Sequence, residues 1–190
     1  MFTKLLLSTA LLSLAEFHAP APELVGSQWI NTPGGKPITL ASRLGKVTVV
    51  EFWTFACINC RHNLPSYARW HTQFAAKDVA IIGIHTPETD AERDPATVAR
   101  HVQELGIQYP VLLDNDYKNW DRWRQQYWPV VYVIDKRGRT DGHCAAWRSA
   151  RAAPCRPNCS ARWSNHSSSL RAQSRKIAAL LRFPKPTSEP

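Results

Sequence analysis

The stretch that decides the fold is EFWTFACINC, residues 51–60. It continues an apolar run that begins at Val47 and leads into a pattern of helical spacing, so it marks the junction between a buried strand and a helix. Cys57 and Cys60 lie at this junction with two residues between them. Two thiols placed in this way can close a small disulfide ring and open it again, which predicts a redox site.

The start of a helix favours a thiolate at Cys57. The first turn presents unpaired N–H groups and the positive end of the helix dipole, which stabilises an anion by roughly 0.3–2 kcal/mol. That energy lowers a thiol pKa by about one unit. Cys60, one turn further along, is expected to face the protein and to act as the resolving thiol.

Three segments resemble the thioredoxin superfamily, and within it the secreted bacterial TlpA/ResA-like and DipZ-like thiol–disulfide oxidoreductases with a redoxin (AhpC-TSA) type domain. They are FWTFACINC at 52–60, GIHTPE at 83–88 and LDNDY at 113–117, and the resemblance covers about residues 20–139. It implies an α/β fold with three layers, α/β/α, around a mixed sheet of four or five strands, with an N-terminal hairpin and an inserted βα segment. It further implies exchange of disulfides with protein substrates, without a bound cofactor.

The resemblance also assigns roles to single residues. In thioredoxins an acid at the place of Glu51, six residues before Cys57, is a buried proton acceptor that acts on the resolving thiol through water. Pro129 takes the place of the cis-proline that packs against the cysteine pair, where the backbone of Trp128 would pair with an extended substrate. Trp53 is assigned to the same substrate site. The alternative for Glu51 is an acid turned towards solvent or paired with a lysine.

The periodicity of the chain predicts the regular elements around this site. A nearly continuous apolar run predicts a buried strand, Asp94 before Pro95 predicts the start of a helix, and Gly106 predicts its end. The expected strands are 47–53, 79–84, 109–113 and 129–135. The expected helices are 58–74, 95–105 and one that contains Trp120 and Trp123.

The two ends of the chain differ from the central region. Residues 1–15 have the pattern of a secretory signal peptide, which predicts a periplasmic or otherwise extracytoplasmic protein, anchored in the membrane if the peptide is uncleaved. Residues 140–190 carry +7 of the net charge of +9 and show neither alternation nor helical period, apart from a closing helix at 169–182. They are interpreted as an atypical tail, disordered or altered by a change of reading frame, after a domain at 19–139.

The charge does not predict nucleic-acid binding, because it lies in the tail and no recognition motif accompanies it. The expected partners are protein disulfides and, by family analogy, a membrane-embedded thiol transporter that supplies electrons to a monomer.

The cysteines allow two other chemistries. The spacing of Thr54 and Cys57 is that of the threonine and peroxidatic cysteine of peroxiredoxins, although Val50 stands where that family has a proline. Metal binding would use Cys57 and Cys60 with His62, or the tail residues His143, Cys144, Cys155, Cys159 and His166. We expect no metal, because the tail set lies in an unpatterned segment.

Overall fold

The computed structural model describes residues 19–74, 76 and 78–145, and the side chains of these up to residue 140. The predicted signal peptide, the predicted helix at 169–182 and the tail residues Cys155, Cys159 and His166 lie outside the described residues. The strands are β1 (Trp29–Ile30), β2 (Val47–Trp53), β3 (Val79–His85), β4 (Val111–Leu113), β5 (Val130–Ile134) and β6 (Thr140–Ala145). The helices are α2 (Ile58–Phe74), α3 (Pro95–Glu104) and α4 (Lys118–Arg122), with 3-10 turns at Pro33–Gly35, Ala41–Arg43 and Asp90–Glu92.

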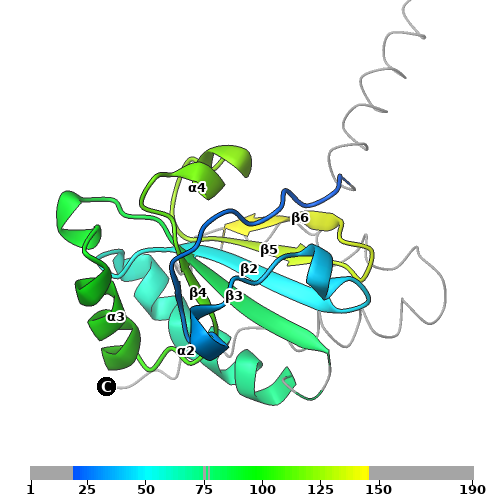
Figure 1. Ribbon diagram of the computed structural model, residues 1–190, viewed down its shortest axis with the longest axis horizontal. Helices are drawn as coiled ribbons and strands as arrows, with labels where there is room; N and C mark the ends of the chain where they lie inside the picture. Colours follow the sequence, from blue (N-terminus) through cyan, green and yellow to red (C-terminus); the bar gives the residue numbers. More distant parts are fainter. Residues whose placement is uncertain (1–18, 75, 77, 146–190) are drawn as a thin grey trace, which may run out of the picture. The chain divides into compact units, whose positions relative to one another are not determined.

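The strands form one mixed sheet in the order β1-β4-β3-β2-β5-β6 (Figure 1). The three central strands β4, β3 and β2 are parallel, and the outer strands β1, β5 and β6 are antiparallel to their neighbours. The predicted fold class is confirmed, with α3 and β4 as the inserted segment between β3 and β5. The sheet has six strands instead of the four or five expected.

The edge strand β6 corrects the expectation that regular structure ends at residue 139. It pairs antiparallel with β5, from Val130 opposite Ala145 to Ile134 opposite Thr140, with an irregularity in the register. The pairing uses backbone N–H and C=O groups, which every residue in this segment can offer. An edge strand of this kind needs no regular alternation of apolar side chains, so the sequence pattern gave no sign of it.

The expected N-terminal hairpin is not present in the described region. Trp29 and Ile30 pair instead with Leu112 and Val111 of β4, far along the chain. The strand ends at Ile30, and the next residue, Asn31, has a left-handed backbone conformation with φ 60°. The Asn31 side-chain amide donates to the carbonyl oxygens of Ile107 and Tyr109, at 2.8 and 3.1 Å. These bonds lead the chain away from the sheet after only two residues of pairing.

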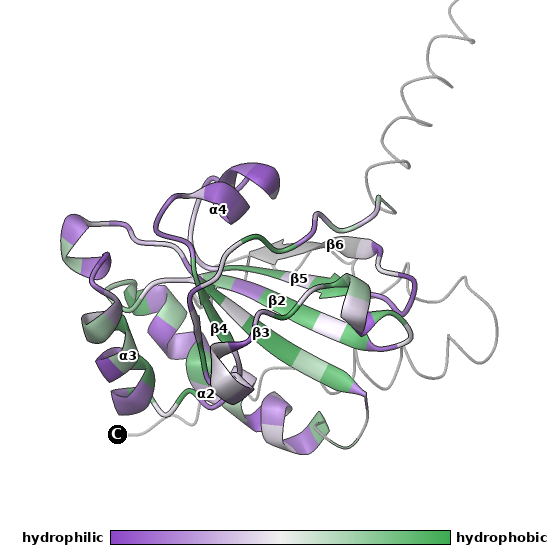
Figure 2. Cartoon of the chain, in the orientation of Figure 1, coloured by the Kyte–Doolittle hydropathy of each residue, from purple (hydrophilic) through white to green (hydrophobic). Residues whose placement is uncertain are grey.

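One face of the sheet carries an apolar cluster. Phe52 of β2 is fully buried there and meets the ring of Trp123 edge-on, with centroids 5.8 Å apart. The cluster joins the sheet to the segment before β2 and to the region of α4 through the buried side chains of Leu24, Trp29, Leu40, Val50, Phe52, Ile82, Ile84, Leu112, Trp123 and Ile134. Figure 2 shows these central strands as mainly hydrophobic and α4 as mainly hydrophilic.

Helices α2 and α3 lie on the opposite side of the sheet (Figure 1). The predicted start of α3 is confirmed: the Asp94 carboxylate accepts hydrogen bonds from the backbone N–H groups of Ala96 and Thr97, with Pro95 in the first turn. Val98 and Val102 lie four residues apart on one side of α3 and are both buried. In the part of the chain that the structure describes, no helix combines the length and the apolar character needed to cross a bilayer.

The first described residues lie beside the turn between β5 and β6. Ala21 donates its N–H to the carbonyl of Gly138 at 2.9 Å, and Thr140 donates to the carbonyl of Ala19 at 3.1 Å. Because Ile134 is in register with Thr48 and Val130 with Phe52, this turn lies at the end of the sheet where β2 begins. The residues that follow β2 lie at the other end.

Candidate active site

Cys57 and Cys60 form a disulfide at the amino end of α2, with their Cα atoms 5.2 Å apart. Cys57 immediately precedes the helix and is partly exposed, whereas Cys60 is 1% exposed. The backbone N–H of Cys60 donates to Sγ of Cys57 at 3.2 Å. Cys57 is therefore the more accessible cysteine of the pair, and a helix N–H group donates to its sulfur.

Glu51 carries its carboxyl group into the interior from the middle of β2. It is 0% exposed and lies in register with Gly83 and Val131 of the neighbouring strands. The hydroxyl of Tyr109 donates to Oε1, while Oε2 has no hydrogen-bond partner among the described residues. Burial raises the pKa of Glu51 to about 8, against the opposing effect of the Tyr109 hydrogen bond. The alternative of a solvent-facing or lysine-paired acid is therefore wrong.

The face of β2 that carries Glu51 is the face that α2 covers. The ring of His71 on α2 lies 6.1 Å from the ring of Tyr109, the partner of Glu51. Burial, together with the adjacent Glu51 carboxyl group, raises the pKa of Tyr109 well above its ordinary value, so the phenol keeps its proton and acts as a donor. Glu51 is thus placed beneath the helix that begins at the cysteine pair.

Trp53 does not belong to a substrate-binding surface, contrary to the expectation. Its side chain is 0% exposed, and its ring lies edge-on to His85 with centroids 5.2 Å apart. A Cβ atom on Gly83 would lie 2.9 Å from Trp53 Nε1, so the absence of a side chain at Gly83 provides the space for the indole. A ring enclosed in this way cannot contact an incoming protein.

The imidazole of His85 packs against Trp53 and is uncharged. It is buried between Trp53 and Phe55, and its ring is stacked on Phe55 with centroids 5.6 Å apart. Burial lowers the pKa of His85 to about 4, despite the attraction of the nearby Glu92 carboxylate. The imidazole is therefore uncharged at neutral pH.

The peptide bond between Trp128 and Pro129 is cis. Pro129 is buried, while Trp128 is half-buried and packs on Trp120 with ring centroids 4.0 Å apart. Two of the exposed large apolar side chains adjoin this bond or the cysteines in sequence: Tyr127 is 44% exposed and Ile58 is 58% exposed.

Glu92 is a functional candidate that sequence reasoning missed. Its carboxylate is 0% exposed, yet it accepts hydrogen bonds from the hydroxyl of Thr54 and from the N–H of Ala56, which directly precedes Cys57. Burial acts to raise the pKa of Glu92, but the hydrogen bonds from Thr54, Ala56, Thr89 and Glu88 outweigh burial and lower it. The capping-box spacing of Thr89 and Glu92 was the signal that would have pointed to this residue.

The two alternative chemistries find little support in the geometry. The Thr54 hydroxyl donates to Glu92, so it is engaged away from the role that peroxiredoxins give their threonine. Across the described residues, no group of three His, Cys, Asp or Glu side chains could hold a metal ion, so Cys57, Cys60 and His62 form no such site. His143 and Cys144 lie on the edge strand β6.

Residues 17–141 match the family model described as the AhpC/TSA family. The chain belongs to the AhpC/TSA family. DipZ of Mycobacterium tuberculosis is 45% identical over 119 residues, which make up 62% of this chain and 17% of DipZ. This AhpC/TSA domain therefore spans less than a fifth of the length of that relative. The thiol-disulfide oxidoreductase YkuV of Bacillus subtilis is 27% identical over 126 residues, which make up 65% of this chain and 82% of YkuV.

Solved structures place the AhpC/TSA domain in the thioredoxin-like fold. The crystal structure of the thioredoxin-like superfamily protein SPOA0173 superposes with a TM-score of 0.64 at 25% identity, covering 88% of this chain and 99% of that one. A thioredoxin-like protein solved in its oxidized form gives the same TM-score at 22% identity, over 84% of this chain and 99% of that one. The resemblance to the thioredoxin superfamily is confirmed.

Proposed function

We propose that this protein is a thiol–disulfide oxidoreductase that exchanges disulfides with protein substrates through Cys57 and Cys60. The observation that carries the proposal is the disulfide at the start of α2, with one partly exposed cysteine and one buried cysteine. Disulfide exchange needs one thiol that attacks the substrate disulfide and a second thiol nearby that releases the substrate. The name of the relative YkuV, a thiol-disulfide oxidoreductase, supports the same activity.

In the reducing direction the dithiol form reacts in two steps. The thiolate of Cys57 attacks one sulfur of a substrate disulfide, which forms a mixed disulfide and releases the other substrate sulfur as a thiolate. The thiolate of Cys60 then attacks Sγ of Cys57, which closes the Cys57–Cys60 disulfide and releases the second substrate sulfur. Two electrons pass to the substrate, and the two thiol protons of the protein end on the substrate thiols. Exposure of Cys57 and burial of Cys60 support this order of attack.

Glu51 is proposed as the proton acceptor for Cys60 in the second step. Its carboxyl group is buried on the sheet face that α2 covers, and its pKa of about 8 makes it able to take or give a proton near neutral pH. The hydroxyl of Tyr109 holds one of its oxygens in place. The other oxygen remains as the acceptor that the role requires, with a water molecule as the carrier to the thiol.

The substrate is proposed to lie along Trp128 and Pro129 as an extended segment. The backbone of Trp128 would pair with the substrate main chain in the manner of an added strand. The exposed apolar side chains of Tyr127 and Ile58 support contact with a protein surface instead of a small polar molecule.

The setting of this activity is proposed to be extracytoplasmic. The apolar segment at residues 1–15 supports export, and an oxidising compartment contains disulfide substrates. Electrons would come from a membrane-embedded thiol-transporting partner, and the protein would act as a monomer. The match to a limited part of DipZ is consistent with a domain that works alongside other units.

The experiment is a disulfide-reduction assay on insulin with dithiothreitol as the electron source. The wild-type protein should accelerate the reduction, and Cys57→Ser should abolish the acceleration because it removes the nucleophile. Cys60→Ser, reduced beforehand and then mixed with insulin without dithiothreitol, should instead accumulate a mixed disulfide with the substrate, seen on a non-reducing gel as an adduct that dithiothreitol removes.

Two results would count against the proposal. One is a Cys57→Ser protein that still reduces insulin at the wild-type rate. The other is rapid consumption of hydrogen peroxide by a wild-type protein that does not reduce insulin, which would favour the peroxidase alternative.

A further inference from the structure

The Glu92 carboxylate joins the loop before Cys57 to the loop after β3. Oε1 accepts from the Thr54 hydroxyl and, at 3.1 Å, from the backbone N–H of Ala56. Oε2 accepts from the N–H groups of Glu88 and Thr89 at 2.7 and 2.8 Å. One buried carboxylate therefore satisfies donors from two segments that are far apart in the sequence, and one of those donors belongs to the residue next to Cys57.

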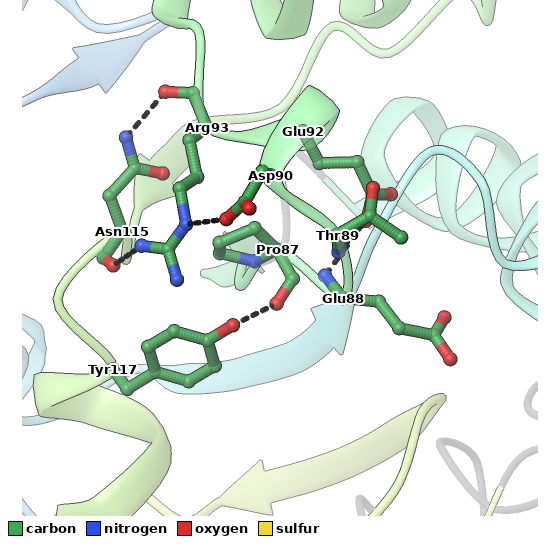
Figure 3. A network of polar contacts seen from close by, with 8 residues as sticks. All are labelled: Pro87, Glu88, Thr89, Asp90, Glu92, Arg93, Asn115 and Tyr117. Atoms are coloured by element: carbon green, nitrogen blue, oxygen red, sulfur yellow. Dashed lines mark hydrogen bonds and ion pairs between the residues drawn. The ribbon is translucent and has the colours of Figure 1, made fainter.

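The loop that carries Glu92 is fixed from its other side as well (Figure 3). The guanidinium of Arg93 donates to the Asp90 carboxylate at 3.1 Å and to the carbonyl of Asn115 at 2.8 Å. The Asn115 amide donates to the carbonyl of Arg93 at 2.7 Å, and the Tyr117 hydroxyl donates to the carbonyl of Pro87 at 2.6 Å. These contacts do not involve the Glu92 side chain, so the loop has its own supports and presents the carboxylate at a set position.

Glu92 is ionised at neutral pH, because its hydrogen bonds lower its pKa despite burial. Its charge is enclosed by protein, where salt screens it little. In addition, its bond to Ala56 occupies the N–H group of the residue that directly precedes Cys57. Both effects disfavour a second negative charge at Cys57.

We propose that Glu92 is a positioning residue that makes this cysteine pair more reducing, by placing a buried negative charge beside the loop that precedes Cys57. The proposal rests on the disulfide exchange proposed above. A neighbouring charge that disfavours the Cys57 thiolate destabilises the dithiol form relative to the disulfide. The protein then gives up its electrons more readily.

Other charged groups around Glu92 are exposed, paired or neutral. The Glu88 side chain, on the same loop, is exposed and points away from the Glu92 carboxylate in Figure 3. Asp90 is paired with Arg93 at the surface, and His101 of α3 is paired with Glu104. His85 on β3 is neutral at pH 7, because burial lowers its pKa to about 4. The buried charge of Glu92 is therefore the feature to test.

The test measures the equilibrium of the Cys57–Cys60 disulfide with glutathione in the full-length protein, together with the pKa of the Cys57 thiol from the pH dependence of its alkylation. Glu92→Gln should lower the thiol pKa by about one unit. At a pH above the thiol pKa of both proteins, where Cys57 is a thiolate, it should also shift the equilibrium towards the dithiol by about three- to tenfold, and tenfold corresponds to about 30 mV. Glu88→Gln is the matched control, because it removes an exposed charge from the same loop and should leave both values unchanged.

Glu92→Asp and Thr54→Val separate charge from geometry. Both keep a carboxylate at the site while removing or lengthening its contacts, so both should retain a value near the wild-type equilibrium. An unchanged equilibrium in Glu92→Gln would overturn the proposal. If Glu92→Gln does not fold, a tenfold shift in either of the other two variants would overturn it. Because the glutathione equilibrium does not involve a protein substrate, this result is independent of the insulin assay that tests the proposed function.

Discussion

Glu51 makes the stability of the protein depend on pH. Burial raises its pKa to about 8 from 4.5, so the folded state keeps a proton that the unfolded chain releases. Stability is then fully present below about pH 4.5 and is lost as the pH rises towards 8, by about 1.4 kcal/mol per pH unit. Glu51→Gln cannot ionise and should remove this slope, as measured by urea unfolding of the oxidised protein at about pH 5 and about pH 8.

The control for this prediction is Asp121→Asn, which removes a carboxylate that is exposed on α4. It should leave the dependence on pH at its wild-type value. A Glu51→Gln protein that loses stability between the two pH values as steeply as the wild type would show that another group causes the dependence.

The sequence predicts those site residues that belong to a recognisable local motif. The spacing of Cys57 and Cys60 predicts the redox pair, and the resemblance to thioredoxins predicts the place of Glu51. Glu92 could not be found as a partner of Thr54 in this way, because their contact joins residues 38 positions apart and depends on how two loops meet. The burial of Trp53 was missed because a tryptophan beside a redox site can lie on the surface or inside, and the absence of a side chain at Gly83 decides which.

At the scale of elements, Gly83 determines how β3 packs beneath α2. A Cβ atom there would lie 2.9 Å from Trp53 Nε1 and 3.2 Å from the ring of Tyr109. Gly83→Ala should therefore destabilise the protein by about 1–3 kcal/mol, because the indole or the phenol must move within a packed core. The measurement is the midpoint and slope of urea unfolding.

A double-mutant cycle tests whether Trp53 is the obstacle to a side chain at residue 83. Trp53→Phe removes the indole nitrogen, so the cost of Gly83→Ala should be smaller in the Trp53→Phe background than in the wild type. Equal costs in both backgrounds would contradict this packing account.

The sequence predicts an element well when the signal lies within that element's own residues. It predicts an element poorly when the element forms only by pairing with a distant strand. β2, α2 and α3 were each predicted from apolar spacing or from a cap such as Asp94 before Pro95. β1 is two residues long and exists because Trp29 and Ile30 pair with β4. β6 likewise depends on its pairing with β5, so the sequence of an edge strand does not by itself predict that strand.

For the molecule as a whole, β6 is expected to be necessary for a protected sheet. Without residues 140–145, one side of β5 would expose its backbone N–H and C=O groups. Unpaired strand edges promote association between chains. A chain that ends at residue 139 should therefore melt at a lower temperature than one that ends at residue 145 and should form larger species in size-exclusion chromatography. Equal melting temperatures and monomeric profiles for both chains would contradict a structural role for this strand.

The backbone bonds between residues 19–21 and the β5–β6 turn also determine how the domain would be presented on a surface. They hold Ala19 at the end of the sheet where β2 starts, whereas Cys57 follows the end of that strand. A tether attached ahead of Ala19, whether a lipid, a resin or another protein, would thus hold the domain at the end of the sheet opposite the cysteine pair. The sulfur of Cys57 would then face away from the tethered surface, towards solution.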